Sequence, residues 1–189
     1  MMSPSVRKFT LAMHLTFSTG WIGGVVAYLA LGLAAATTQD ADTVRATWIG
    51  MELTGWFAIV PLALASLLTG LVMALGTKWG LFRHYWVLIS FALAVFATVI
   101  LLLHMPDVSV LADVARESEG ALGPNGHLYS RLQEGDLLHP GLGLVVLLVI
   151  QVLNVYKPRG LTRHGWRKEE EVRRRALRSK QEQRRVVRP

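Results

Sequence analysis

FTLAMHLTFSTGWIGGVVAYLALGLAAA, residues 9–36, contains no Asp, Glu, Lys or Arg. A helix that crosses the hydrocarbon core of a bilayer needs about 20 consecutive, mostly apolar residues, and this stretch exceeds that length. Three further uncharged, apolar stretches occupy roughly residues 54–76, 85–105 and 137–156. The pattern predicts an all-α, polytopic membrane protein in which four transmembrane helices form a bundle.

The composition of the 189-residue chain agrees with this interpretation. Hydrophobic residues make up 52% of it, which is above the fraction found in typical soluble domains. Cysteine is absent, which excludes disulfide bonds and thiolate ligands for metals. The sequence contains no Walker loop and none of the GxSxG, HExxH and CxxC motifs, so it assigns the chain to no enzyme class.

The basic residues beside the spans are unevenly distributed. Arg7 and Lys8 precede the first span, and most of the chain's 20 Lys and Arg residues follow the fourth. Lys78 and Arg83 lie between the second and third spans. Because positively charged flanks stay on the cytoplasmic side, we expect both termini in the cytoplasm and the loops after the first and third spans on the outer side. The expected location is the bacterial inner membrane.

Residues 157–189 form a basic tail after the four-span domain of residues 1–156. Three consecutive glutamates in it each stand four residues before an arginine, a spacing that supports a helix, so we expect the tail to be partly helical. Anionic lipid headgroups attract such a polybasic segment by about 1 kcal/mol per Lys or Arg. Nucleic acid is not an expected partner, because no aromatic residue follows Trp166 among the basic residues.

Two histidines at the outer ends of the third and fourth spans each have an aspartate three residues away. His104 is followed by Asp107, and His139 is preceded by Asp136. Two imidazoles and two carboxylates suit Zn or Cu, and Met105 adds a soft ligand that Cu(I) prefers. The sequence therefore predicts a candidate metal site at the outer side.

The alternative reading of these positions needs no metal. Pro140 places His139 at the boundary of the fourth helix, and Pro106 is expected to end the third helix. Residues 108–120 then have the spacing of a short interfacial helix, followed by a turn-rich segment. His127 lies in that segment and is expected to be a solvated loop residue.

His14 is a candidate cofactor ligand, because an ionisable group within a span is costly and marks a functional position. It lies near the cytoplasmic end of the first span, a membrane thickness away from the outer histidines. On an adjoining face, Gly20 and Gly24 form a small-xxx-small pair. Such a pair admits a helix of the same chain or of a second copy in a homo-oligomer, and it also leaves room for a flat cofactor. His84 is expected in the headgroup zone beside two aromatic residues.

The pattern MHLTFSTGWIGGVV at residues 13–26, with GLFRHYWVLIS at residues 80–90, resembles an uncharacterised family of bacterial four-span membrane proteins. That family is similar to copper-resistance D proteins and HemJ-type protoporphyrinogen oxidases, which share a first-helix histidine followed by a Trp-x-Gly stretch. His14 and residues 21–23 occupy those positions here. The resemblance covers roughly residues 9–156 and implies copper handling or a haem-associated redox role with His14 as the ligand of haem b. All five lysines lie outside the spans, so the membrane-embedded lysine expected of HemJ-type proteins is missing.

These observations leave three functions open. The first is haem binding or a redox role, with either His14 or His104 and His139 as ligands. The second is binding of copper or zinc at the outer cluster. The third function is a noncatalytic membrane scaffold whose basic tail binds lipid.

Overall fold

The computed structural model describes residues 2–77, 80–117, 132, 136–158 and 160–186. Within these ranges the elements are helices, with one isolated antiparallel β-bridge between His84 and Leu161. In chain order the helices are α1 (Pro4–Thr37), α2 (Ala41–Thr54), the π-helical turn η1 (Gly55–Ile59), α3 (Val60–Gly76), α4 (Tyr85–Glu117), α6 (Leu138–Tyr156) and α7 (Arg163–Val186).

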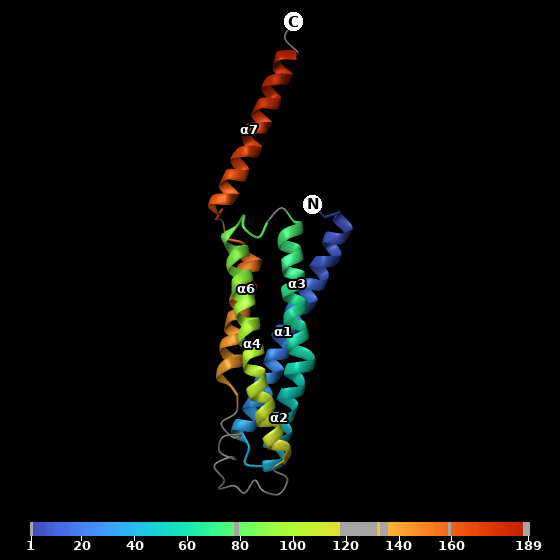
Figure 1. Ribbon diagram of the computed structural model, residues 1–189, viewed down its shortest axis with the longest axis vertical. Helices are drawn as coiled ribbons and strands as arrows, with labels where there is room; N and C mark the ends of the chain where they lie inside the picture. Colours follow the sequence, from blue (N-terminus) through green and yellow to red (C-terminus); the bar gives the residue numbers. More distant parts are fainter. Residues whose placement is uncertain (1, 78–79, 118–131, 133–135, 159, 187–189) are drawn as a thin grey trace.

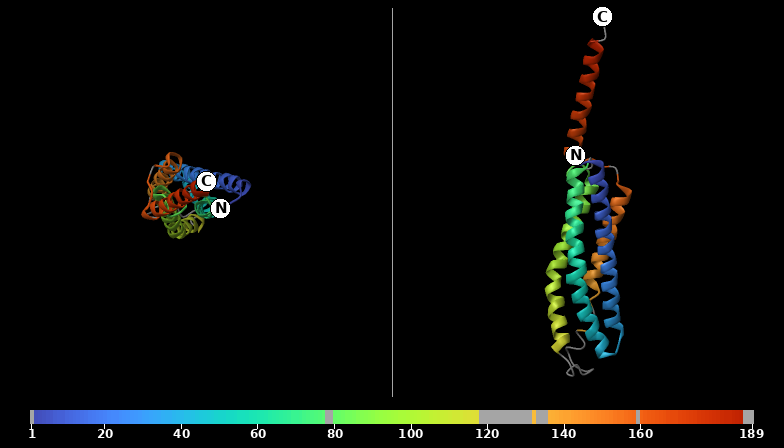
Figure 2. Two further views of the ribbon diagram at one scale, coloured as in Figure 1. Left: turned by 90° about the horizontal axis from the view of Figure 1, so that it is seen from above. Right: turned by 90° about the vertical axis from the view of Figure 1, so that its right-hand side faces the viewer.

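Four helical runs are long and apolar enough to cross a membrane: α1, the run Ala41–Gly76 from α2 through α3, α4 and α6. They lie side by side, and successive runs are antiparallel (Figure 1). The prediction of an all-α, multi-pass membrane protein with a four-helix bundle is confirmed. We call the end of the bundle that carries both chain termini the inner end, and the opposite end, where α1 leads into α2, the outer end (Figure 2).

Three of the four runs are longer than a bilayer requires. At 1.5 Å per residue, the 34 residues of α1 and the 33 of α4 measure about 50 Å, against about 30 Å for the hydrocarbon core. The 19 residues of α6 measure about 28 Å and match that thickness. Because α6 starts only at Leu138, the ends of α1, α2 and α4 project beyond it as an outer extension (Figure 1).

The outer extension has its own packed core, so the segment after the first span is the helix α2 and not a loop. Asp40 caps α2 by accepting hydrogen bonds from the backbone N–H of Thr43 at 3.0 Å and from its hydroxyl at 2.5 Å. The hydrogen bonds from the Thr43 hydroxyl and backbone lower the pKa of the Asp40 carboxyl. The buried apolar face of α2, which carries Val44, Trp48 and Met51, then packs against α4, whose side chains in the same core include Val108 and Ala115.

The expectation that Pro106 ends the third helix was wrong, because α4 continues through it to Glu117. Proline removes one backbone hydrogen bond from a helix. The side chains around it compensate, since Met105 and Val108 are each only 1% exposed in the core shared with α1 and α2. Packing in the outer extension therefore offsets the lost hydrogen bond, and α4 stays helical on both sides of Pro106.

A second proline explains the π-helical turn in the Ala41–Gly76 run. Pro61 lies in the first turn of α3 and has no N–H for the carbonyl four residues earlier. The Val60 N–H instead bonds to the carbonyl of Gly55, five residues back. The turn brings Gly55 against the side chain of Met105, where a larger residue would collide with it.

The small-xxx-small pair of α1 packs within this chain. A Cβ atom added at Gly20 would lie 3.2 Å from Leu62 of α3, and one added at Gly24 would lie 3.1 Å from Ile59 of η1. The pair therefore brings α1 close to the α3 run, and these glycines supply no argument for a homo-oligomer.

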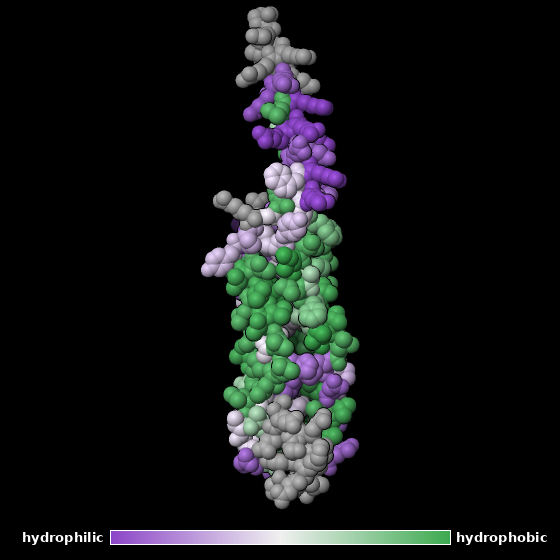
Figure 3. Space-filling model, turned by 90° about the vertical axis from the view of Figure 1, so that its left-hand side faces the viewer, coloured by the Kyte–Doolittle hydropathy of each residue, from purple (hydrophilic) through white to green (hydrophobic). Residues whose placement is uncertain are grey.

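The basic tail begins with a short docked link and continues as α7. The Thr162 N–H donates to the Arg83 carbonyl at 3.1 Å, next to the β-bridge between His84 and Leu161. The Thr162 hydroxyl accepts from the Gly165 N–H at 3.1 Å and caps α7. From there α7 extends away from the bundle as a hydrophilic rod beyond the hydrophobic spans (Figures 1 and 3). Its binding to anionic lipid headgroups stays a prediction.

Candidate functional site

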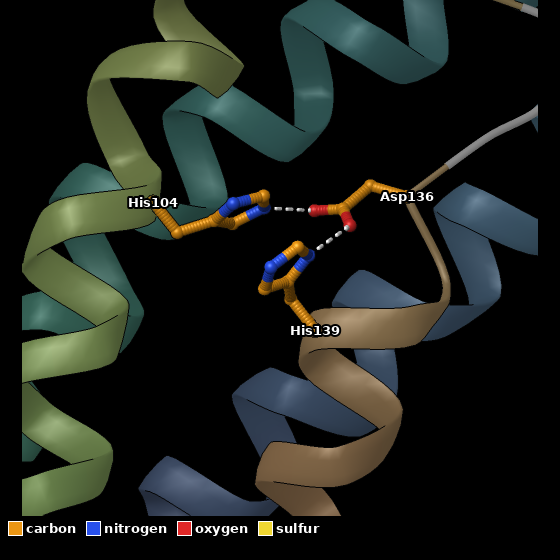
Figure 4. Close-up of side chains that lie close together, drawn as sticks. All are labelled: His104, Asp136 and His139. Carbon is orange, nitrogen blue, oxygen red and sulfur yellow. Dashed lines mark hydrogen bonds and ion pairs between the residues drawn. The ribbon is translucent and has the colours of Figure 1, made fainter.

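Three side chains from α4, from α6 and from the segment before α6 meet at the outer end of α6. His104 projects from α4, His139 from the first turn of α6, and Asp136 lies between them (Figure 4). Nε2 of His104 is 2.5 Å from Oδ2 of Asp136, and Nδ1 of His139 is 3.8 Å from Oδ1 of the same carboxylate. The two imidazole rings stack with their centroids 4.2 Å apart and their planes inclined by 19°.

Tyr28 of α1 holds the carboxylate from the third side. Its hydroxyl donates a 2.8 Å hydrogen bond to Oδ2 of Asp136, and both residues are buried. Burial raises the pKa of the Asp136 carboxyl, but the hydrogen bonds from His104 and Tyr28 outweigh it, so this pKa lies below its ordinary value of 3.8. Asp136 is therefore a carboxylate at neutral pH.

Gly32 explains why the chain can place Asp136 so close to α1. It lies one turn after Tyr28 on the same face of the helix. A Cβ atom at this position would lie 2.8 Å from the backbone oxygen of Asp136 and 3.1 Å from the side chain of Leu137. The backbone of Asp136 thus occupies the space that a side chain at position 32 would fill, here called the Gly32 seat, and Tyr28 binds the Asp136 carboxylate.

The three side chains offer a set of metal ligands. One nitrogen from each of His104 and His139 and one carboxylate oxygen of Asp136 all lie within 4.8 Å of one another. Asp107, which the sequence grouped with them, is exposed on α4 and lies outside this set. Met105 is buried nearby, but its sulfur packs at the position of Gly55. Among the residues that the structure describes, the donors are therefore two imidazoles and one carboxylate.

The same geometry does not suit joint haem ligation by His104 and His139. Two axial ligands of one haem approach the iron from opposite faces of the macrocycle. Here the two rings stack face to face at 4.2 Å, which leaves no space for a porphyrin between them.

A mostly apolar cavity of about 310 Å³, here called the outer cavity, adjoins the three side chains. Phe96 of α4 and Leu142 of α6 line it and are 58% and 60% exposed, so the cavity opens sideways between these helices. In a bilayer this opening faces acyl chains. On the face shown in Figure 3, a hydrophilic patch interrupts the hydrophobic surface towards the outer end.

His14 lies in the inner half of the bundle and does not join this site. Its Nδ1 is 3.2 Å from the Ser66 carbonyl oxygen and 3.1 Å from the Thr69 hydroxyl of α3. A carbonyl oxygen only accepts, so the contact with Ser66 is a hydrogen bond when Nδ1 carries the proton, and in the neutral imidazole the lone pair is then on Nε2. Gly70 provides the space for the ring, because a Cβ atom there would be 3.1 Å from Cε1 of His14.

Two other described histidines, His84 and His164, lie at the inner end and on α7. His84 forms the β-bridge with Leu161 at the inner end, and its ring centroid is 6.4 Å from that of Trp86. His164 is exposed on α7. His127 lies outside the described residues, so its predicted loop environment stays a prediction.

The sequence did not identify Tyr28 and Gly32 as parts of the outer site. A signal for Tyr28 was present, because a tyrosine hydroxyl within an apolar span needs a hydrogen-bond partner. Nothing in the sequence indicates that this partner is Asp136, 108 residues away.

Comparison with known protein families, with curated proteins and with solved structures finds no match for this chain.

Proposed function

We propose that this multi-pass membrane protein binds a divalent transition-metal ion at the outer end of its bundle, and that Zn²⁺ is the preferred ion. The observation that carries the proposal is the set of three ligand atoms from His104, Asp136 and His139 within 4.8 Å. Tetrahedral zinc sites with three protein ligands and one open position use this kind of donor set.

The donor types narrow the choice of metal. Imidazole suits Zn²⁺ and Cu²⁺, whereas Cu⁺ prefers the thioether or thiolate sulfur that this set lacks. Two histidines and one carboxylate also bind Fe²⁺ in non-haem sites. Zn²⁺ is favoured because it forms stable four-coordinate sites with these ligands and needs no electron donor.

Each residue has a defined task in this proposal. His104 binds the ion through the nitrogen that now contacts Asp136, so metal binding competes with the 2.5 Å contact between them. Tyr28 keeps its hydrogen bond to the carboxylate and orients it, as second-layer partners do in metal sites. The outer cavity excludes bulk water on the side of the acyl chains and leaves room for an apolar molecule beside the ion.

Metal analysis of the detergent-purified protein tests the proposal. We expect one Zn²⁺ per chain after equilibration with Zn²⁺ and removal of excess metal. The His104→Ala, His139→Ala double variant should lose it, and the control His164→Ala, which removes an exposed tail histidine, should retain it. A wild-type protein without metal, or an unchanged content in the double variant, contradicts the proposal.

A second candidate function is haem binding at His14. It is favoured by the Nε2 lone pair that the Ser66 contact leaves, and by the motif resemblance at residues 13–26. An absorption spectrum after expression with added haem tests it. A Soret band that disappears in His14→Ala supports it, and the absence of a band refutes it.

A further inference from the structure

A second cavity, here called the inner cavity, lies between all four spans in the inner half of the bundle. Its volume is about 510 Å³, within the range of small-molecule pockets. It reaches from Arg7 and Lys8 of α1 and Lys157 after α6 to Trp21 and Leu147, which also line the outer cavity. Between Arg7 and Trp21, α1 rises by about 21 Å. The inner cavity is therefore a deep space and not a surface dent.

The charged groups at the inner cavity have one sign. Arg7, Lys8 and Lys157 line it, and among the residues that the structure describes no aspartate or glutamate does. Arg7 and Lys8 are exposed, which places their charges at the mouth of the cavity. This distribution attracts an anion and disfavours a metal cation.

The wall contains a buried hydroxyl without a partner. Ser90 of α4 is only 6% exposed, it lines the inner cavity, and its Oγ has no hydrogen-bond partner among the described residues. Buried polar atoms in folded proteins nearly always have a partner, and leaving one unsatisfied is costly. Gln151 and Asn154 of α6 add amide donors to the same wall.

The cavity also has an apolar side that is open towards lipid. Leu11 and Leu15 of α1 and Val155 of α6 line it and are 43%, 48% and 65% exposed. Towards the inner end α1 inclines away from α4 and α6 (Figure 1). A molecule in the inner leaflet can therefore enter sideways without crossing water.

We propose that the inner cavity binds an anionic phospholipid from the inner leaflet. The phosphate lies at the mouth between Arg7, Lys8 and Lys157, where charge complementarity holds it. The ester oxygens accept hydrogen bonds from the Ser90 hydroxyl and from the amides of α6. The acyl chains lie along Leu11 and Leu15. This site is independent of the proposed metal site, which lies beyond Trp21 and Leu147.

Lipid binding by native mass spectrometry tests the charge part of the proposal. The probe is phosphatidylglycerol, with phosphatidylcholine of the same acyl chains as its neutral comparison. Each basic residue near the phosphate contributes about fivefold, so Arg7→Gln, Lys8→Gln should bind phosphatidylglycerol about 30-fold more weakly than wild type. The matched control Arg45→Gln, Arg116→Gln removes the same charge at the outer end, away from the inner cavity and from the basic tail, and should bind like wild type. Equal losses in both variants, or no preference for phosphatidylglycerol, overturn the proposal.

A thiol-protection experiment tests the position of the lipid. Because the chain has no cysteine, Ser90→Cys introduces a single thiol. We expect maleimide to label it at least about fivefold more slowly in nanodiscs of phosphatidylglycerol than in nanodiscs of phosphatidylcholine. Thr98→Cys, at a buried position of α4 outside both cavities, should label alike in the two lipids. Equal rates for Ser90→Cys in the two lipids overturn the proposal. Because His14 also lines the inner cavity, a haem that co-purifies with the protein and is lost in His14→Ala overturns it as well.

Discussion

Replacing Gly32 by alanine should weaken metal binding without touching a ligand. The added Cβ would lie 2.8 Å from the Asp136 carbonyl oxygen, whereas ordinary contact begins at 3.4 Å, so that carbonyl must retreat by about 0.6 Å. The obstacle is backbone, which cannot rotate away as a side-chain tip can. The carboxylate moves with it, away from Tyr28 and His104.

The magnitude follows from two opposing terms. Overpacking of this kind costs about 1–3 kcal/mol, and replacing glycine by alanine in a helix returns about 1 kcal/mol. We therefore expect Gly32→Ala to destabilise the protein by up to about 2 kcal/mol. Displacing an oriented ligand should weaken Zn²⁺ binding by about 10–100-fold, as loss of a second-layer contact does.

Gly23→Ala is the matched control, because a Cβ atom at Gly23 on the same helix meets nothing within 4 Å. Both variants are titrated with Zn²⁺ against a competing chelator in detergent, and thermal unfolding is recorded alongside. Gly23→Ala should bind Zn²⁺ like wild type. If Gly32→Ala binds with the same affinity as Gly23→Ala, the Gly32 seat does not position Asp136 and the reasoning fails.

Three further predictions concern single contacts. Tyr28→Phe removes the 2.8 Å hydrogen bond to Asp136, and we expect about tenfold weaker Zn²⁺ binding and a loss of roughly 1 kcal/mol; unchanged affinity would contradict this. The pKa of Asp136 is lowered by folding, so its stabilisation is complete above the unfolded-state pKa near 4 and is lost as the pH falls through the lower folded-state pKa. Thermal unfolding of the metal-free protein should therefore lose more stability below pH 4 than Asp136→Asn does, and parallel curves would refute this. Thr162→Ala removes the cap of α7, at a cost of about 1 kcal/mol, and should speed hydrogen exchange at Gly165; unchanged exchange would show that the cap is not needed.

Three of the four helical runs are longer than the uncharged stretches of the sequence, so hydropathy predicted the spans but not the full lengths of the helices. Uncharged runs mark the part of a helix that lies in hydrocarbon, so they predicted four spans and missed the outer extension. α2 contains charges, but Val44, Trp48 and Met51 recur at helical spacing on its buried face. The predicted helix end at Pro106 was wrong because packing against α1 and α2, which lie far away in the sequence, outweighs the loss of one backbone hydrogen bond at the proline.

The sequence by itself determined the number of spans and placed His104 and His139 at the outer ends of their uncharged stretches, because uncharged length and position along it are properties of a single segment. It also grouped Asp136 with His139 through their spacing. Only the tertiary structure decided which side chains meet: it brought Tyr28 and Gly32 of α1 to Asp136, left Asp107 outside the donor set, and separated His14 from all of them. The physical reason is that contacts between helices depend on how each is rotated about its axis and on how far it projects. Those quantities are set by packing against neighbours, as where Gly32 leaves the space that the backbone of Asp136 fills.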